Sequence, residues 1–138
     1  MASLRDALDT AVYNRLSTDS ALRVYPIRNG MLQANDPLPA IVFNWQDGTP
    51  MAGRTFTQRG WDAEYLVKVI SESGYPKSAA EIESLVDDRL EGCSLTVANF
   101  THVACTRMRD VSFPEHAAGG RELYHVGAMW LIREDRAL

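Results

Sequence analysis

Cysteine and histidine are scarce in this chain of 138 residues. The two cysteines, Cys93 and Cys105, are too few for a disulfide scaffold, and without an export signal we interpret them as reduced, buried thiols of a cytosolic protein. They are also too far apart for the close cysteine pairs of structural zinc sites. The three histidines, His102, His116 and His125, form no i, i+4 pair and lie beside no cysteine pair. We therefore expect no metal ligand, no cofactor-binding residue and no nucleophilic cysteine.

Long apolar runs and an excess of positive charge are missing as well. No apolar segment approaches the roughly 20 residues that span a bilayer, and the start, Met1–Asp6, lacks the apolar stretch of a signal peptide. The formal net charge of −4 disfavours a free nucleic-acid-binding protein. The hydrophobic content of 46% is ordinary for a globular protein, and the length suits one domain over residues 1–138. We expect a single domain that contacts no membrane.

Known catalytic motifs are missing too. The glycines form no Gly-x-Gly-x-x-Gly or phosphate-loop pattern, and no serine lies in a Gly-x-Ser-x-Gly elbow. Asp87 and Asp88 stand beside Arg89 and, like Glu81 and Glu83, are interpreted as the solvated face of a helix. We therefore expect no catalytic residue and a protein that is not an enzyme.

Two segments have the apolar spacing of amphipathic helices. The first runs from about Leu4 to Leu16, and the second from about Ala79 to Glu91 after a capping-box pattern at Ser78 and Glu81. Each helix has one apolar face that needs a sheet to cover it. We expect a core in which the helices pack on the apolar face of one strand, through Leu8, Val12, Leu16, Ile82, Leu85 and Val86 against Ala63, Tyr65, Val67 and Val69.

Other segments are rich in β-branched and aromatic residues. The clearest is Trp61–Ser71, where apolar residues alternate with mostly polar ones. Further strands are expected at 22–25, 40–45, 103–111 and 122–132, with a short one possible at 95–97. Strands do not alternate regularly with helices, which argues against a doubly wound parallel sheet. The predicted fold class is α+β: a mostly antiparallel four- or five-stranded sheet with two helices packed on one face.

The segment from Gln46 to Gly60 is predicted to be a long loop, because it is polar and contains three glycines and one proline. It contains Met51, Arg54, Phe56 and Arg59. Methionine, arginine and aromatic residues are enriched in protein interfaces. We interpret this loop as an oligomerisation and docking arm; the alternative is an ordinary hairpin tip.

The order of these elements resembles the tail-terminator (tail-completion) proteins of long-tailed bacteriophages, the group that includes the minor tail protein U of phage lambda. The resemblance spans nearly the whole chain and rests on order and spacing. It comprises an opening helix with a Leu-Arg-Asp-Ala-Leu start, then Arg23–Pro26, a proline-led strand from Leu38 to Phe43, Arg59 before the alternating strand 61–70, the helix 78–90, and two strands at 107–110 and 123–126.

This resemblance implies a non-enzymatic virion protein, assembled in the host cytoplasm and located at the head–tail interface. It implies a homo-oligomeric ring, typically a hexamer, that caps the head-proximal end of the tail tube and ends tail polymerisation. The implied partners are the tail tube protein and a head-completion or connector protein, and DNA passes through the lumen without specific binding. An acidic chain is compatible with such a lumen, since like charges repel.

Three other functions remain open at the level of the sequence. One is a neighbouring ring protein of the head–tail interface, such as a head-closure, stopper or neck protein. Another is a small ligand-binding or enzymatic α+β domain, which would need convergent polar groups in a pocket. The third is a component of a prophage-derived contractile or secretion device.

Overall fold

The computed structural model describes residues 4–50, 60–72, 76–97, 100–116 and 120–136. Along the chain it contains α1 (Leu4–Ser17), β1 (Ile27–Asn29), β2 (Ala40–Pro50), β3 (Gly60–Glu72), α2 (Pro76–Leu90), β4 (Phe100–His116) and β5 (Glu122–Arg136). The five strands form one sheet in the order β1-β2-β3-β5-β4. β1 lies parallel to β2, and every other neighbouring pair is antiparallel. The predicted α+β class is confirmed.

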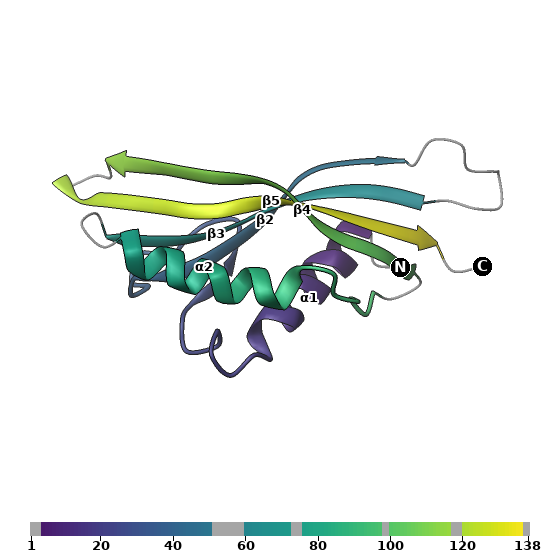
Figure 1. The fold of residues 1–138 in the computed structure, drawn as a ribbon, viewed down its shortest axis with the longest axis horizontal. Coiled ribbons are helices and arrows are strands. Elements are labelled where there is room, and N and C mark those ends of the chain that lie inside the picture. The colour runs from purple at the N-terminus through teal and green to yellow at the C-terminus, as the bar shows by residue number, and fades with distance from the viewer. Residues whose placement is uncertain (1–3, 51–59, 73–75, 98–99, 117–119, 137–138) are drawn as a thin grey trace.

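Both helices cover the same face of the sheet (Figure 1). Because successive strand residues point to opposite faces, alternate residues of β3 and their partners on β2 and β5 face the helices. Tyr65 pairs with Trp130, for example, and Val67 with Ala128 and Phe43. These residues and the apolar faces of α1 and α2 form the main hydrophobic core.

A half-buried hydrogen bond attaches α1 to the centre of the sheet. The hydroxyl of Tyr65 donates to Oδ1 of Asp9 at 2.6 Å. Burial, together with this bond to a carboxylate, raises the pKa of Tyr65 far above its ordinary value, so the phenol stays protonated. The bond thus satisfies the one polar atom of a side chain that is otherwise enclosed in the core.

Two arginines join the C-terminal ends of the helices. Nε of Arg15 donates to the carbonyl oxygen of Arg89 at 2.9 Å, and Nε of Arg89 donates to the carbonyl oxygen of Arg15 at 2.8 Å. The last carbonyls of a helix have no partner within it and carry partial negative charge, which a guanidinium neutralises. The reciprocal pair therefore satisfies both helix ends and fixes the helices to each other.

The expected strands at Leu22–Tyr25 and 95–97 are wrong. After α1, the main-chain carbonyl of Asp19 accepts hydrogen bonds from the N–H groups of Leu22 and Arg23. The side-chain carboxylate of Asp19 accepts one from the N–H of Ala21 at 2.8 Å. These local hydrogen bonds form turns in place of a sheet ladder. Leu22 is buried in a turn, and the strand begins only at Ile27. Residues 95–97 contribute buried Leu95 and Val97 to the core without pairing as a strand.

The predicted core is confirmed at Leu8, Val12, Leu16, Ile82 and Val86, and wrong at one position. Leu85 is 40% exposed. On α2 the buried residues are Ala79, Ile82, Val86 and Leu90, which follow the i, i+3, i+4 spacing of a narrow stripe. Leu85 belongs to the apolar face of α2, but it lies at the margin of that face, which the sheet does not cover.

The difference between Ile82 and Leu85 predicts different stabilities for two alanine variants. Ile82→Ala should lower the free energy of unfolding by about 2–5 kcal/mol, because the side chain is 4% exposed and its removal leaves a cavity. Leu85→Ala should change it by about 0.5 kcal/mol or less, as for a surface position. Urea denaturation of both variants measures the two values. Equal losses would show that α2 is rotated relative to this arrangement.

Candidate functional site

The predicted arm is shorter than the sequence indicated, because its ends belong to the sheet. β2 continues to Pro50 and β3 begins at Gly60, with Pro50 paired to Trp61. The polar residues Gln46 and Asp47 form strand structure despite their composition, since they are exposed and the ladder continues past a register shift between Trp45 and Asp47. The connection is therefore 51–59, and Met51, Arg54, Phe56 and Arg59 lie outside the described residues.

The described sheet has an open strand edge at each end of its strand order. β4 is the last strand on one side, and β1 pairs only with Ile41–Phe43 of β2 on the other side. The outer edge of β2 from Asn44 to Pro50 therefore has no partner strand among the described residues. Open edges carry unpaired backbone donors and acceptors, which suit pairing with another chain. β4 shows register shifts between His102 and Ala104 and between Arg107 and Arg109, which interrupt the regular ladder of this edge.

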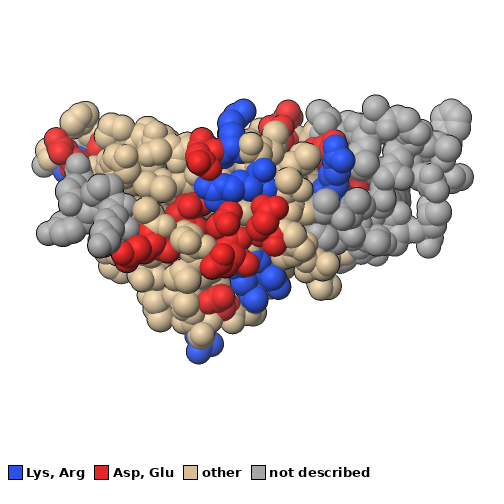
Figure 2. Space-filling view, viewed as in Figure 1, with Lys and Arg blue, Asp and Glu red and all other residues tan. Residues whose placement is uncertain are grey.

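Arg107 on β4 is the centre of a carboxylate cluster that joins β4 to α2. Its Nη1 lies 2.5 Å from Oε1 of Glu83 and 2.8 Å from Oδ1 of Asp87, and its Nη2 lies 2.8 Å from Oδ1 of Asp110. Its backbone N–H also donates to Oε2 of Glu91 at 3.1 Å. Figure 2 shows acidic side chains gathered around basic ones over α2.

The cluster keeps Arg107 charged and the α2 surface acidic. Burial works to lower the pKa of Arg107, but the hydrogen bonds to Glu83 and Asp110 outweigh it and raise that pKa. The guanidinium also lies over the ring of Trp130, 5.8 Å from its centroid, and so covers the core.

The expectation of a merely solvated helix face is wrong for Glu83 and Asp87, which are half-buried, whereas Glu81 and Asp88 are exposed. No local pattern could reveal this, since the partners are about twenty positions apart.

The two cysteines are buried and free, as predicted. Cys93 follows α2 and Cys105 lies on β4, and the two thiols are hydrogen-bonded. That bond, with burial, raises the pKa of Cys105 far above its ordinary value, so the thiol stays protonated. A protonated, buried thiol is a poor nucleophile, which agrees with a packing role for Cys105.

The described residues can also be compared with the requirements of a metal site and of a membrane-spanning helix. Within the described ranges, no group of three or more histidine, cysteine or acidic side chains is arranged to hold a metal ion. None of the helices in that part of the chain combines the length and the hydropathy needed to cross a membrane.

The sequence matches the model of a known protein family. The chain matches the model of the family described as tail completion protein gp17 over residues 10–127. It therefore belongs to this family of phage tail completion proteins, and it is a structural protein of a phage tail. The predicted family is thus confirmed. No curated protein matches the chain, and the resemblance to protein U of phage lambda stays a prediction.

Solved structures share the fold. A chain from the virion of a native gene transfer agent particle is 17% identical, with a TM-score of 0.68 over 97% of this chain and 99% of that chain. A second solved chain is 12% identical, with a TM-score of 0.58 over 95% of this chain and 96% of that chain. At these identities the likeness establishes the common architecture alone.

Proposed function

We propose that this protein is a tail terminator: a ring of identical copies that caps the head-proximal end of the tail tube, ends its polymerisation and provides the docking surface for the head connector. Membership of the tail completion family carries this proposal. The solved chain of similar fold belongs to a virion particle, which supports a place in the virion for this chain as well. On this proposal residues 1–138 act as one assembly domain without enzymatic activity.

The open strand edges support association into a ring. β4 and the outer edge of β2 lie on opposite sides of one sheet and are different surfaces. Contact between two different surfaces of identical copies is heterologous, and it closes into a ring when the rotation between copies divides a full turn. A hexamer would match a six-fold tail tube. On this proposal the acidic surface over α2 lines the lumen, where its negative charge repels DNA and lets it pass without binding.

We also propose that the connection 51–59, with Met51, Arg54, Phe56 and Arg59, is the oligomerisation and docking arm. β2 and β3 support this placement, because they are paired as far as Pro50 and Trp61 and so deliver both ends of the connection to the same end of one hairpin. An arm held at the end of a long strand pair can reach a neighbouring copy or the tail tube.

The test is controlled assembly with the tail tube protein of the same phage. Light scattering at two salt concentrations should show weak association of the chain alone and ring formation once finished tubes are added. Tails made without the protein should grow beyond the normal length. Tails of normal length that fail to join heads would instead identify a head-closure or stopper protein. A chain that stays monomeric with finished tubes would overturn the proposal.

A further inference from the structure

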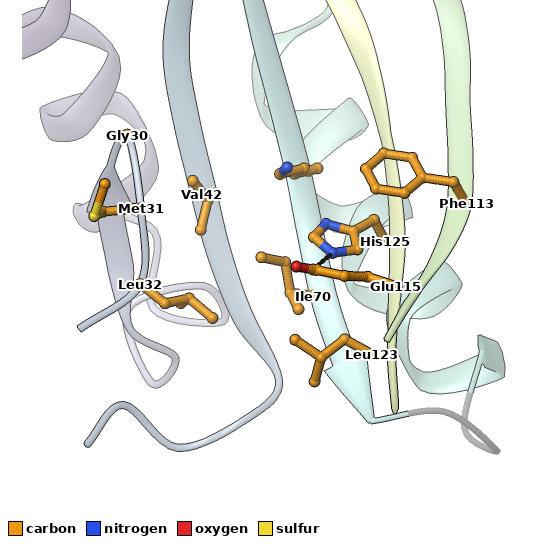
Figure 3. Close-up of a pocket in the computed structure, with 10 residues that line it drawn as sticks. Gly30, Met31, Leu32, Val42, Ile70, Phe113, Glu115, Leu123 and His125 are labelled. Atoms are coloured by element: carbon orange, nitrogen blue, oxygen red, sulfur yellow. Dashed lines mark hydrogen bonds and ion pairs between the residues drawn. The ribbon is translucent and has the colours of Figure 1, made fainter. Parts of the chain in front are cut away.

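A pocket of about 380 Å³ opens on the face of the sheet that the helices leave uncovered. Four strands and the loop after β1 contribute to it, as Figure 3 shows. Its lining combines apolar side chains with three polar ones: Gly30, Met31, Leu32, Val42, Lys68, Ile70, Phe113, Glu115, Leu123 and His125. The volume lies near the lower end of the range of ligand pockets.

The loop that forms one wall is held in place before any ligand binds. Arg28 on β1 forms two bonds to the carboxylate of Asp36, at 2.9 and 2.7 Å, and the same carboxylate accepts from the N–H of Gln33 at 2.8 Å. The N–H of Gly30 donates to the carbonyl oxygen of Phe43 at 2.9 Å. Because the wall is already ordered, a ligand would not bear the entropic cost of ordering it.

The floor of the pocket is apolar. Val42, Ile70 and Leu123 form a small second core that is separate from the core under the helices, and Leu32 and Leu38 pack against it. Phe113 also lines the pocket and is 38% exposed, whereas Val42, Ile70 and Leu123 are at most 8% exposed. An apolar side chain entering here would therefore mainly remove the ring of Phe113 from water.

His125 presents an unused acceptor in the pocket. Its ring stacks on Phe113 with centroids 4.4 Å apart, and its Nε2 lies 2.5 Å from Oε2 of Glu115. Burial lowers the pKa of His125 despite the opposing effect of Glu115, so the ring is neutral near pH 7 and the proton on Nε2 is donated to the carboxylate. Nδ1 is then an acceptor, and this buried atom has no hydrogen-bond partner among the described residues.

Lys68 presents an unpaired cation beside it. Burial lowers the pKa of this half-buried ammonium more than Glu115 raises it. Its Nζ lies 5.4 Å from the centroid of the Phe113 ring, and within the described residues it forms no ion pair. Glu115 attracts this ammonium without forming an ion pair with it, so a carboxylate placed here would give Lys68 a direct partner.

We propose that this pocket binds a segment of another protein in which an apolar side chain is followed by aspartate or glutamate. The apolar side chain lies over the buried floor and against the exposed ring of Phe113. A main-chain N–H of the segment donates to Nδ1 of His125, and the acidic side chain pairs with Lys68. A free C-terminal carboxylate is a poorer fit, because such groups are held by several backbone N–H donors and that of Gly30 is already used. The identity of the partner as a tail or head-completion protein rests on the proposed function. The binding chemistry of the pocket is independent of that function.

The test uses the isolated full chain and two blocked peptides that differ only in charge, acetyl-Ala-Leu-Glu-Ala-amide and acetyl-Ala-Leu-Gln-Ala-amide. A nuclear magnetic resonance titration should show the glutamate peptide binding about tenfold more tightly than the glutamine peptide. The signals that shift should include Lys68 and the imidazole of His125. Lys68→Met keeps the stem beside Phe113 and should abolish the preference, whereas Lys68→Arg should retain it. Arg121→Gln is the matched control, since Arg121 is an exposed cation outside the pocket lining, and it should leave the preference unchanged.

Equal binding of the two peptides would overturn the proposal, as would the absence of binding by both at millimolar concentration. Tighter binding of N-acetyl-leucine than of the glutamate peptide would overturn it in favour of a free carboxylate terminus. The assay needs neither a ring nor a tail tube, so a negative result here leaves the tail-terminator assay unaffected, and the reverse also holds.

Discussion

A variant with Met51, Arg54 and Phe56 all changed to alanine is expected to keep its thermal midpoint and lose ring formation and tail capping. Each residue that becomes ordered on a neighbour costs about 1–2 kcal/mol of backbone conformational entropy. A buried aromatic side chain and charge-assisted bonds from arginine are the contacts that can offset such a cost. Removing Phe56, Arg54 and the apolar side chain of Met51 together should therefore abolish assembly. Electron microscopy of tails made with the variant measures the effect directly, as tube length.

The matched control changes Tyr13, Arg23 and Val24 to alanine. These three side chains are exposed and lie in α1 or in the turn that follows it, outside the connection 51–59, so tails should retain their normal length. If the arm variant still caps tails at the normal length, the arm lies elsewhere, and the β4–β5 connection at 117–119 becomes the next candidate. If the arm variant also loses its thermal midpoint, Phe56 belongs to the fold of the monomer.

Trp130→Ala is expected to cause the largest loss of stability among core substitutions, about 3–5 kcal/mol. Trp130 is 1% exposed, pairs with Tyr65 across the sheet and lies under Arg107. Its removal would leave a cavity at the centre of the sheet and withdraw the surface on which the guanidinium rests. A marginally stable domain would lose much of its folded population, which a thermal denaturation measures.

Trp130→Phe separates packing from polarity at the same position. The indole N–H of Trp130 is buried and has no hydrogen-bond partner among the described residues. Phenylalanine loses volume but removes this unsatisfied donor, whose burial opposes folding. The loss should therefore be well below that of the alanine variant. A phenylalanine variant as unstable as the alanine variant would show that the N–H group is satisfied in the folded protein.

The sequence by itself determined the class and order of the elements, because helix and strand periodicities are local. The spacing of Leu8, Val12 and Leu16 specifies a helical face, and the alternation along residues 61–71 specifies a strand with one apolar side. The same order of elements carried the resemblance to tail completion proteins, which the family match confirms. The absence of known catalytic patterns pointed in the same direction.

The tertiary structure decided which residues meet. Polar residues at 46–50 form a strand because a partner continues the ladder, and Leu85 is exposed because the sheet covers only part of the apolar arc of α2. Arg107 meets Glu83 and Asp87 only after α2 docks on the sheet. The pocket at Lys68 and His125 likewise requires β3, β4 and β5 to pair in one register. Such contacts join residues far apart in the chain, and their formation depends on register and packing, which no local pattern encodes.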